Sequence, residues 1–126
     1  MVAGLEVQMS VCDDVVVVAT IGEVDIATAP QLDDALVAAI TAGADAGLLC
    51  CDLSQVTFLD STGLSTLALA RKRASAEGLE FCIVGASGPV EKVLKLTAMD
   101  RVFASYDSVN AARRERGDDP RPLPVG

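Results

Sequence analysis

Two kinds of hydrophobic pattern alternate along this chain of 126 residues. Short apolar runs rich in β-branched residues are typical of strands, whereas apolar residues spaced three and four apart are typical of amphipathic helices. The strand-like runs are residues 5–11, 15–21, 47–53, 80–85 and 102–104, and residues 55–59 lead from the third run toward a loop. Because helical patterns separate the later runs, the order of elements predicts an α/β domain.

The two longest predicted helices have recognisable ends. Thr28 is placed to cap the first helix, with Gln31 at the spacing of a capping box, and Gly43 ends it. Ser61 is placed to cap the second helix, which stops at Gly78. Each helix carries an apolar stripe, which predicts that it packs against the sheet.

Two shorter helices are predicted in the second half of the chain, one opened by residues 87–89 and one from Ser108 through Arg116. The first two strands are close enough in sequence to form a hairpin, whereas the later strands need helical crossovers. We therefore expect an α/β fold with a mixed β-sheet of about four to five strands and α-helices packed mainly on one face. The composition then turns to Gly, Asp, Pro and Arg, which predicts one domain over residues 1–116 and a flexible tail over residues 117–126.

The charge and hydropathy of the chain limit its partners and its location. The net charge is −8, from 18 acidic and 10 basic residues, which argues against nucleic acid or an anionic membrane as a partner. No apolar run approaches the ~20 residues that cross a bilayer, and the N-terminus shows no signal peptide. We expect a cytoplasmic protein.

Several kinds of catalytic site are excluded by the residues that are absent. The chain has no histidine, which rules out a Ser-His-Asp triad and removes the commonest general base. No glycine-rich phosphate loop and no cluster of metal ligands is visible in the sequence. We therefore expect a protein that is not an enzyme and that uses no cofactor or metal.

The four cysteines are Cys12, Cys50, Cys51 and Cys82. The last three lie in apolar strand-like runs, where cysteine usually behaves as a small buried hydrophobe. A disulfide between Cys82 and either Cys50 or Cys51 is the alternative, and it needs neighbouring strands that bring the Cα atoms within ~7 Å.

The sequence Asp60-Ser61-Thr62-Gly63 stands where a buried strand gives way to a helix. A hydroxyl at a helix start is well placed to carry a phosphate, because free N–H groups and the helix dipole favour negative charge there. The plainer interpretation of Ser61 is an N-cap, which is worth typically ~1 kcal/mol. Ser54 is a weaker second candidate for modification.

Three segments resemble the STAS domain family, and more narrowly its single-domain form, the bacterial anti-sigma factor antagonists. The segments are Gly22-Glu23-Val24-Asp25, then Asp52-Leu53-Ser54-x-Val56-x-Phe58-x-Asp60-Ser61-x-Gly63-Leu64, then Val93-Leu94-x-Leu96-x-x-Met99-Asp100-x-Val102-Phe103. They occur in order within residues 5–112, nearly the whole chain.

The resemblance implies a partner-switching cycle that controls transcription in the stress response. The unphosphorylated antagonist binds an anti-sigma factor, which is also a serine kinase with a histidine-kinase-like ATPase fold, and a sigma factor is released. Phosphorylation at the residue matching Ser61 abolishes binding, and a PP2C-type phosphatase resets the cycle. The expected partner-binding residues are Gly22, Glu23, Asp25, Asp60, Ser61, Thr62 and Gly63.

A second hypothesis keeps the family but changes the control. The chain would then be a ligand- or redox-sensing STAS regulatory module that no kinase controls, with Cys50, Cys51 and Cys82 as its candidate redox residues.

Overall fold

The computed structural model describes residues 4–12 and 14–118. The last helix includes residues 117 and 118, so it ends two residues beyond the domain boundary expected from composition. The rest of the predicted tail, residues 119–126, lies outside the described residues.

The described residues form five strands, four α-helices and one short 3-10 helix. In chain order they are β1 (Leu5–Val11), β2 (Val16–Val24), α1 (Ala29–Ala42), β3 (Leu48–Leu59), α2 (Ser61–Ala76), β4 (Glu80–Val84), α3 (Gly88–Leu96), η1 (Met99–Arg101), β5 (Ala104–Tyr106) and α4 (Val109–Asp118).

All five strands belong to one mixed sheet, in the order β1-β2-β3-β4-β5. β1 and β2 form the predicted antiparallel hairpin, with Leu5 opposite Gly22. The other neighbours are parallel, because α1, α2 and α3 each return the chain to the same end of the sheet. The predicted α/β fold with a mixed sheet of about four to five strands is confirmed.

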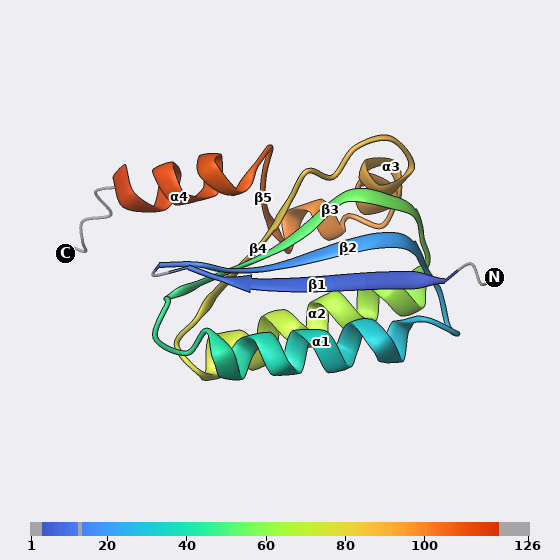
Figure 1. The fold of residues 1–126 in the computed structure, drawn as a ribbon. Helices are drawn as coiled ribbons and strands as arrows, with labels where there is room; N and C mark the ends of the chain where they lie inside the picture. The colour runs from blue at the N-terminus through green and yellow to red at the C-terminus, as the bar shows by residue number, and fades with distance from the viewer. Residues whose placement is uncertain (1–3, 13, 119–126) are drawn as a thin grey trace.

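The helices divide between the two faces of the sheet (Figure 1). The long helices α1 and α2 lie side by side on one face, over a large aliphatic core. α4 lies on the opposite face and covers a smaller apolar cluster through the buried Ala112. None of the helices in the described part of the chain is both long and apolar enough to span a membrane.

β2 is longer than the sequence suggests. It was expected to stop at residue 21, with Gly22 in the loop, but it continues through Val24. Gly22 has a φ of +116° beside a shift in the β2–β3 register, and a Cβ there would lie 2.5 Å from the Gly4 carbonyl oxygen. Only glycine fits this position without strain, so it allows the strand to continue where a loop was expected.

The capping box expected at the start of α1 does not form. Thr28 is the N-cap residue, but its side chain makes no capping hydrogen bond; its hydroxyl donates to the Glu23 carbonyl oxygen at 2.8 Å. The Gln31 side chain donates to the carbonyl oxygen of Leu5 at 2.8 Å, so it joins the helix to β1. The Thr28 and Gln31 side chains therefore bind the end of β2 and the edge strand β1, and they do not cap the N-terminus of α1.

The last strand is displaced from its expected position at residues 102–104. Phe103 is buried against Phe81, with ring centroids 6.1 Å apart, and η1 precedes it. The strand therefore begins only at Ala104. The final helix starts as expected, because the Ser108 hydroxyl accepts a hydrogen bond from the Ala111 N–H at 3.1 Å.

The contrast between two leucines on α2 tests the position of the main core. Leu67 is fully buried, whereas Leu69 is 43% exposed. We expect Leu67→Ala to lower the free energy of unfolding by about 2–5 kcal/mol, because it leaves a cavity. Leu69→Ala is the matched control and should change it by less than about 0.5 kcal/mol in urea unfolding. Equal losses would contradict this placement of α2 on the sheet.

Candidate functional site

The loops that follow β2 and β3 meet at one end of the sheet. Val24 and Leu59 are opposite each other in the parallel ladder, and the Asp60 N–H donates to the Val24 carbonyl oxygen at 3.3 Å. Asp25 and Asp60 therefore leave adjacent strand ends. The structure thus brings together the two segments that were expected to form the partner-binding site.

Asp60, and not Ser61, is the N-cap of α2. One oxygen of its carboxylate accepts hydrogen bonds from the N–H groups of Thr62 at 3.0 Å and Gly63 at 3.1 Å. Its carbonyl oxygen accepts from the Leu64 N–H at 3.0 Å. The expectation that Ser61 caps this helix is wrong, because the preceding aspartate is an equally good cap and already holds the first turn.

Ser61 is the first residue of α2, and it is exposed. Its hydroxyl makes no hydrogen bond with any residue in the described part of the chain. Because the capping role belongs to Asp60, the Ser61 hydroxyl can be modified or contacted without removing a bond on which the helix depends.

Asp25 organises the loop that follows β2. Its carboxylate accepts hydrogen bonds from the N–H groups of Ala27 at 2.9 Å and Thr28 at 3.1 Å. The Thr28 hydroxyl also accepts from the Asp25 N–H at 3.0 Å. Asp25 is thus a loop-forming residue. Glu23, two residues earlier on β2, is exposed.

Gly63 serves the packing of α2 against the strand ends. It is buried, and a Cβ at this position would clash with the Leu59 side chain and lie 2.8 Å from Val24 Cγ1. Thr62 is half-buried, and its carbonyl oxygen accepts a hydrogen bond from the Thr66 hydroxyl at 3.0 Å. Among the expected site residues, Glu23 and Ser61 are therefore the most exposed.

Two exposed apolar side chains near this end of the sheet were not expected. Ile26 is 77% exposed and lies between Asp25 and Thr28, and Phe58, two residues before Asp60, is 47% exposed. The sequence does carry a signal for Ile26, since it is an apolar residue inside a polar turn. Exposed apolar side chains at one end of a sheet are typical of a protein–protein contact.

The first 70 residues, which include every expected site residue, carry no basic side chain. Ten of the 18 acidic residues precede residue 70, whereas all ten lysines and arginines lie at or after Arg71. Glu23, Asp25 and Asp60 therefore belong to a half of the chain without a basic side chain. A further negative charge at Ser61 would be added next to the Asp60 carboxylate.

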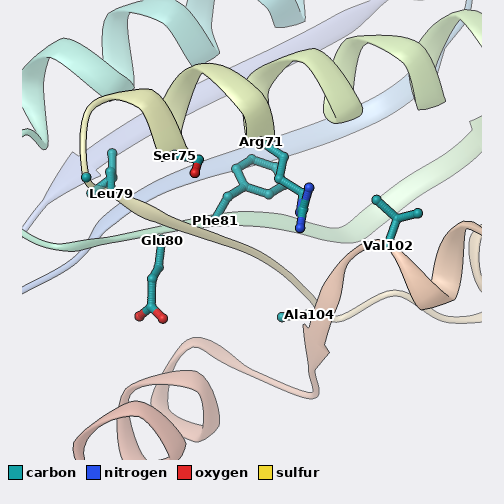
Figure 2. Close-up of a pocket in the computed structure, with 8 residues that line it drawn as sticks. Arg71, Ser75, Leu79, Glu80, Phe81, Val102 and Ala104 are labelled. Atoms are coloured by element: carbon teal, nitrogen blue, oxygen red, sulfur yellow. The ribbon is translucent and has the colours of Figure 1, made fainter. Parts of the chain in front are cut away.

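A groove of about 400 Å³ lies away from the Ser61 site. Figure 2 shows it between the later part of α2, β4 and the approach to β5, with the Arg71 side chain beside the Phe81 ring. None of the expected site residues lines this groove. Its polar side chains, Arg71, Ser75 and Glu80, are all exposed, so they do not form a fixed set of polar groups around a ligand.

Comparison with known proteins decides the family. The model of the STAS domain family matches residues 6–112. The chain belongs to the STAS domain family. The segments that resembled this family are therefore correctly assigned, and the Ser61 loop is part of a STAS domain.

Related STAS proteins are known from bacteria. A crystal structure of an anti-sigma factor antagonist from Mycobacterium paratuberculosis is 33% identical, with a TM-score of 0.78 over 90% of this chain and 96% of that chain. A crystal structure of a candidate anti-sigma factor antagonist from Thermotoga maritima is 27% identical, with a TM-score of 0.74 over 86% of this chain and 92% of that chain.

Curated relatives match over a shorter segment. A candidate anti-sigma factor antagonist of Thermotoga maritima is 36% identical over 63 residues, which are 50% of this chain and 56% of that protein. The chain thus matches only about half the length of the curated relatives.

The assignment of the α2 cap can be tested by two alanine substitutions in adjacent residues. We expect Asp60→Ala to destabilise the STAS domain by about 1 kcal/mol, because two N–H groups lose their acceptor. Ser61→Ala should change the free energy of unfolding by less than about 0.5 kcal/mol. Chemical denaturation measures both, and a larger loss for Ser61→Ala would show that the serine is the cap.

Proposed function

We propose that this STAS domain is an anti-sigma factor antagonist whose binding is controlled by phosphorylation of Ser61. The unphosphorylated form binds an anti-sigma factor that is also a serine kinase with a histidine-kinase-like ATPase fold. This binding releases a sigma factor for transcription. A PP2C-type phosphatase restores the unphosphorylated form. The protein acts in the cytoplasm and is not itself an enzyme.

The observation that carries this proposal is the exposed Ser61 hydroxyl at the first residue of α2, with its capping role taken by Asp60. A kinase needs a hydroxyl that it can reach. The surrounding segments match those of the family, and an antagonist from Mycobacterium paratuberculosis is 33% identical over nearly its whole length.

A phosphate on Ser61 should leave the fold intact. Phosphoserine adds about −1.5 to −2 charges and three acceptor oxygens at one point. The N–H groups of Thr62 and Gly63 already bond to Asp60, so the phosphate gains little from them and extends toward solvent. Phosphorylation should therefore change the charge of the surface and leave the fold as it is.

The same phosphate is costly inside an interface. The contact surface that we propose consists of Glu23, Ile26, Ser61 and the exposed side of α2 at Ser65 and Leu69. A partner that closes around the neutral hydroxyl would have to bury a dianion beside Asp60. Leaving a buried charge unpaired costs several kcal/mol, and each ~1.4 kcal/mol lowers affinity tenfold.

The domain that carries this function is proposed to comprise residues 1–116, with residues 117–126 as a tail. The tail contains no residue of the proposed contact surface.

Glutamate substitutions at two serines of α2 test the switch. Ser61→Glu places a negative charge at the proposed site, and Ser75→Glu places the same charge at an exposed position about 21 Å further along the helix. Each variant, with the wild type and Ser61→Ala, is immobilised and exposed to a lysate of the source organism, and retained proteins are identified by mass spectrometry. The amount of an ATPase-fold anti-sigma factor retained by Ser61→Glu should be at least about tenfold lower than the amount retained by the wild type, Ser61→Ala or Ser75→Glu.

The recovered partner then tests the modification directly. Mixed with ATP and magnesium, it should phosphorylate the wild type at Ser61, as located by peptide mass spectrometry, and leave Ser61→Ala unmodified. A partner that binds Ser61→Glu as well as wild type would overturn the electrostatic switch. Absence of any anti-sigma factor from all four columns would overturn the proposed function.

The exposed isoleucine in the loop after β2 should contribute to the same contact. We expect Ile26→Ser to weaken binding of the recovered anti-sigma factor by about tenfold or more, because an exposed apolar side chain loses its burial at the interface. Val11→Ser is the control, since Val11 is also exposed but lies at the opposite end of the β1–β2 hairpin. Titration calorimetry measures both, and equal affinities would remove Ile26 from the contact surface.

A further inference from the structure

Cys50 and Cys82 face each other on two adjacent strands of the sheet. They are register partners on the parallel strands β3 and β4, and both are buried. The Cys82 thiol donates a hydrogen bond to the sulfur of Cys50, with the two Sγ atoms 3.4 Å apart. Neighbouring strands lie about 4.7–4.9 Å apart, which is within the range of Cα separations that disulfides span.

Cys51 is excluded as the partner of Cys82. It is adjacent to Cys50 in β3 and therefore points to the other face of the sheet, into the core beneath α1 and α2. Its sulfur lies 3.9 Å from the Thr20 hydroxyl. Burial raises the pKa of the Cys51 thiol to about 12, so it stays protonated and unreactive.

The contact with Cys82 makes the Cys50 thiol easier to deprotonate than an isolated buried thiol. The hydrogen bond from Cys82 lowers the pKa of the Cys50 thiol, and burial of Cys50 works against this effect. The same contact and burial raise the pKa of Cys82. Cys50 is therefore the sulfur that becomes the nucleophile, and Cys82 supplies the second thiol.

The cover over this pair is thin. The two cysteines belong to the small apolar cluster that α4 covers with the buried Ala112 and the partly buried Val109. Figure 1 shows α4 on the face of the sheet opposite to α1 and α2. A surface ion pair, from Arg113 Nε to Asp14 Oδ2 at 3.1 Å, joins α4 to the connection between β1 and β2. A short helix held by few apolar contacts opens more readily than a core element, and opening would expose both sulfurs.

We propose that Cys50 and Cys82 form a reversible disulfide when the protein meets hydrogen peroxide, and that α4 controls access to them. The Cys50 thiolate attacks one peroxide oxygen; the O–O bond breaks, and Cys50 becomes a sulfenic acid while hydroxide leaves and is protonated to water. The Cys82 sulfur then attacks the Cys50 sulfur and loses its proton, the S–O bond breaks, and a second water leaves. The two thiols supply the two electrons that reduce the peroxide.

This site is independent of the proposed phosphorylation. Cys50 and Leu59, which precedes Asp60, are nine residues apart on β3, a distance of about 30 Å along an extended strand. Oxidation can therefore be measured without any partner protein, and its result does not depend on the proposed function.

The first experiment counts and locates the bond. The full chain with Cys12→Ser, which removes the exposed cysteine, is treated with hydrogen peroxide and analysed by intact and peptide mass spectrometry without reductant. We expect a loss of about 2 Da, a crosslinked pair of peptides containing Cys50 and Cys82, and full recovery with dithiothreitol. Adding Cys51→Ser should preserve the bond, whereas adding Cys50→Ser or Cys82→Ser should abolish it.

The second experiment tests the role of α4. In the Cys12→Ser background, Arg113→Ala removes the ion pair, and Arg114→Ala removes an exposed neighbouring charge as the control. We expect at least a twofold faster formation of the disulfide for Arg113→Ala only. Equal rates in all three proteins would overturn control by α4, and addition of oxygen to either sulfur without a crosslink would overturn the disulfide itself.

Discussion

The parallel ladder between β2 and β3 runs from Val16 opposite Leu49 to Val24 opposite Leu59. Everything at the candidate site depends on this pairing, since it ends both strands at the same place and lets the Asp60 N–H bond to Val24. The ladder contains two register shifts, and one of them lies at Gly22, where only glycine fits beside the Gly4 carbonyl. Gly22 is thus required for the strand pairing that positions Ser61, although it lies outside the Ser61 loop.

At the end of this ladder, backbone hydrogen bonding determines which side chains remain available. Asp25 and Asp60 both accept hydrogen bonds from backbone N–H groups, so each carboxylate holds a loop or a helix end. Ser61 is left exposed and without a structural duty. Because Asp60 already accepts hydrogen bonds from the first turn of α2, Ser61 can gain a negative charge without loss of the helix.

The sequence was sufficient to predict the mixed sheet, the order of the helices and the family, because hydrophobic period and a long motif report on these directly. It could not decide between Asp60 and Ser61 as the cap, since both residue types cap helices equally well and stand side by side. It also could not choose between Cys50 and Cys51 as the partner of Cys82. That choice depends on which face of β3 each sulfur occupies, and hence on a register that only the folded sheet defines.

The alternation of β3 also separates two environments within one strand. Cys51 points into the core beneath α1 and α2, whereas Cys50 points toward α4 and meets Cys82. Further along, the shift in register beside Gly22 interrupts the alternation, so that Val56 and Leu59 are buried and Phe58 between them is exposed. The same strand therefore places a thiol pair beneath α4 near its start and an exposed phenylalanine near its end. Because these features lie on different stretches of β3, a change at one need not disturb the packing that supports the other.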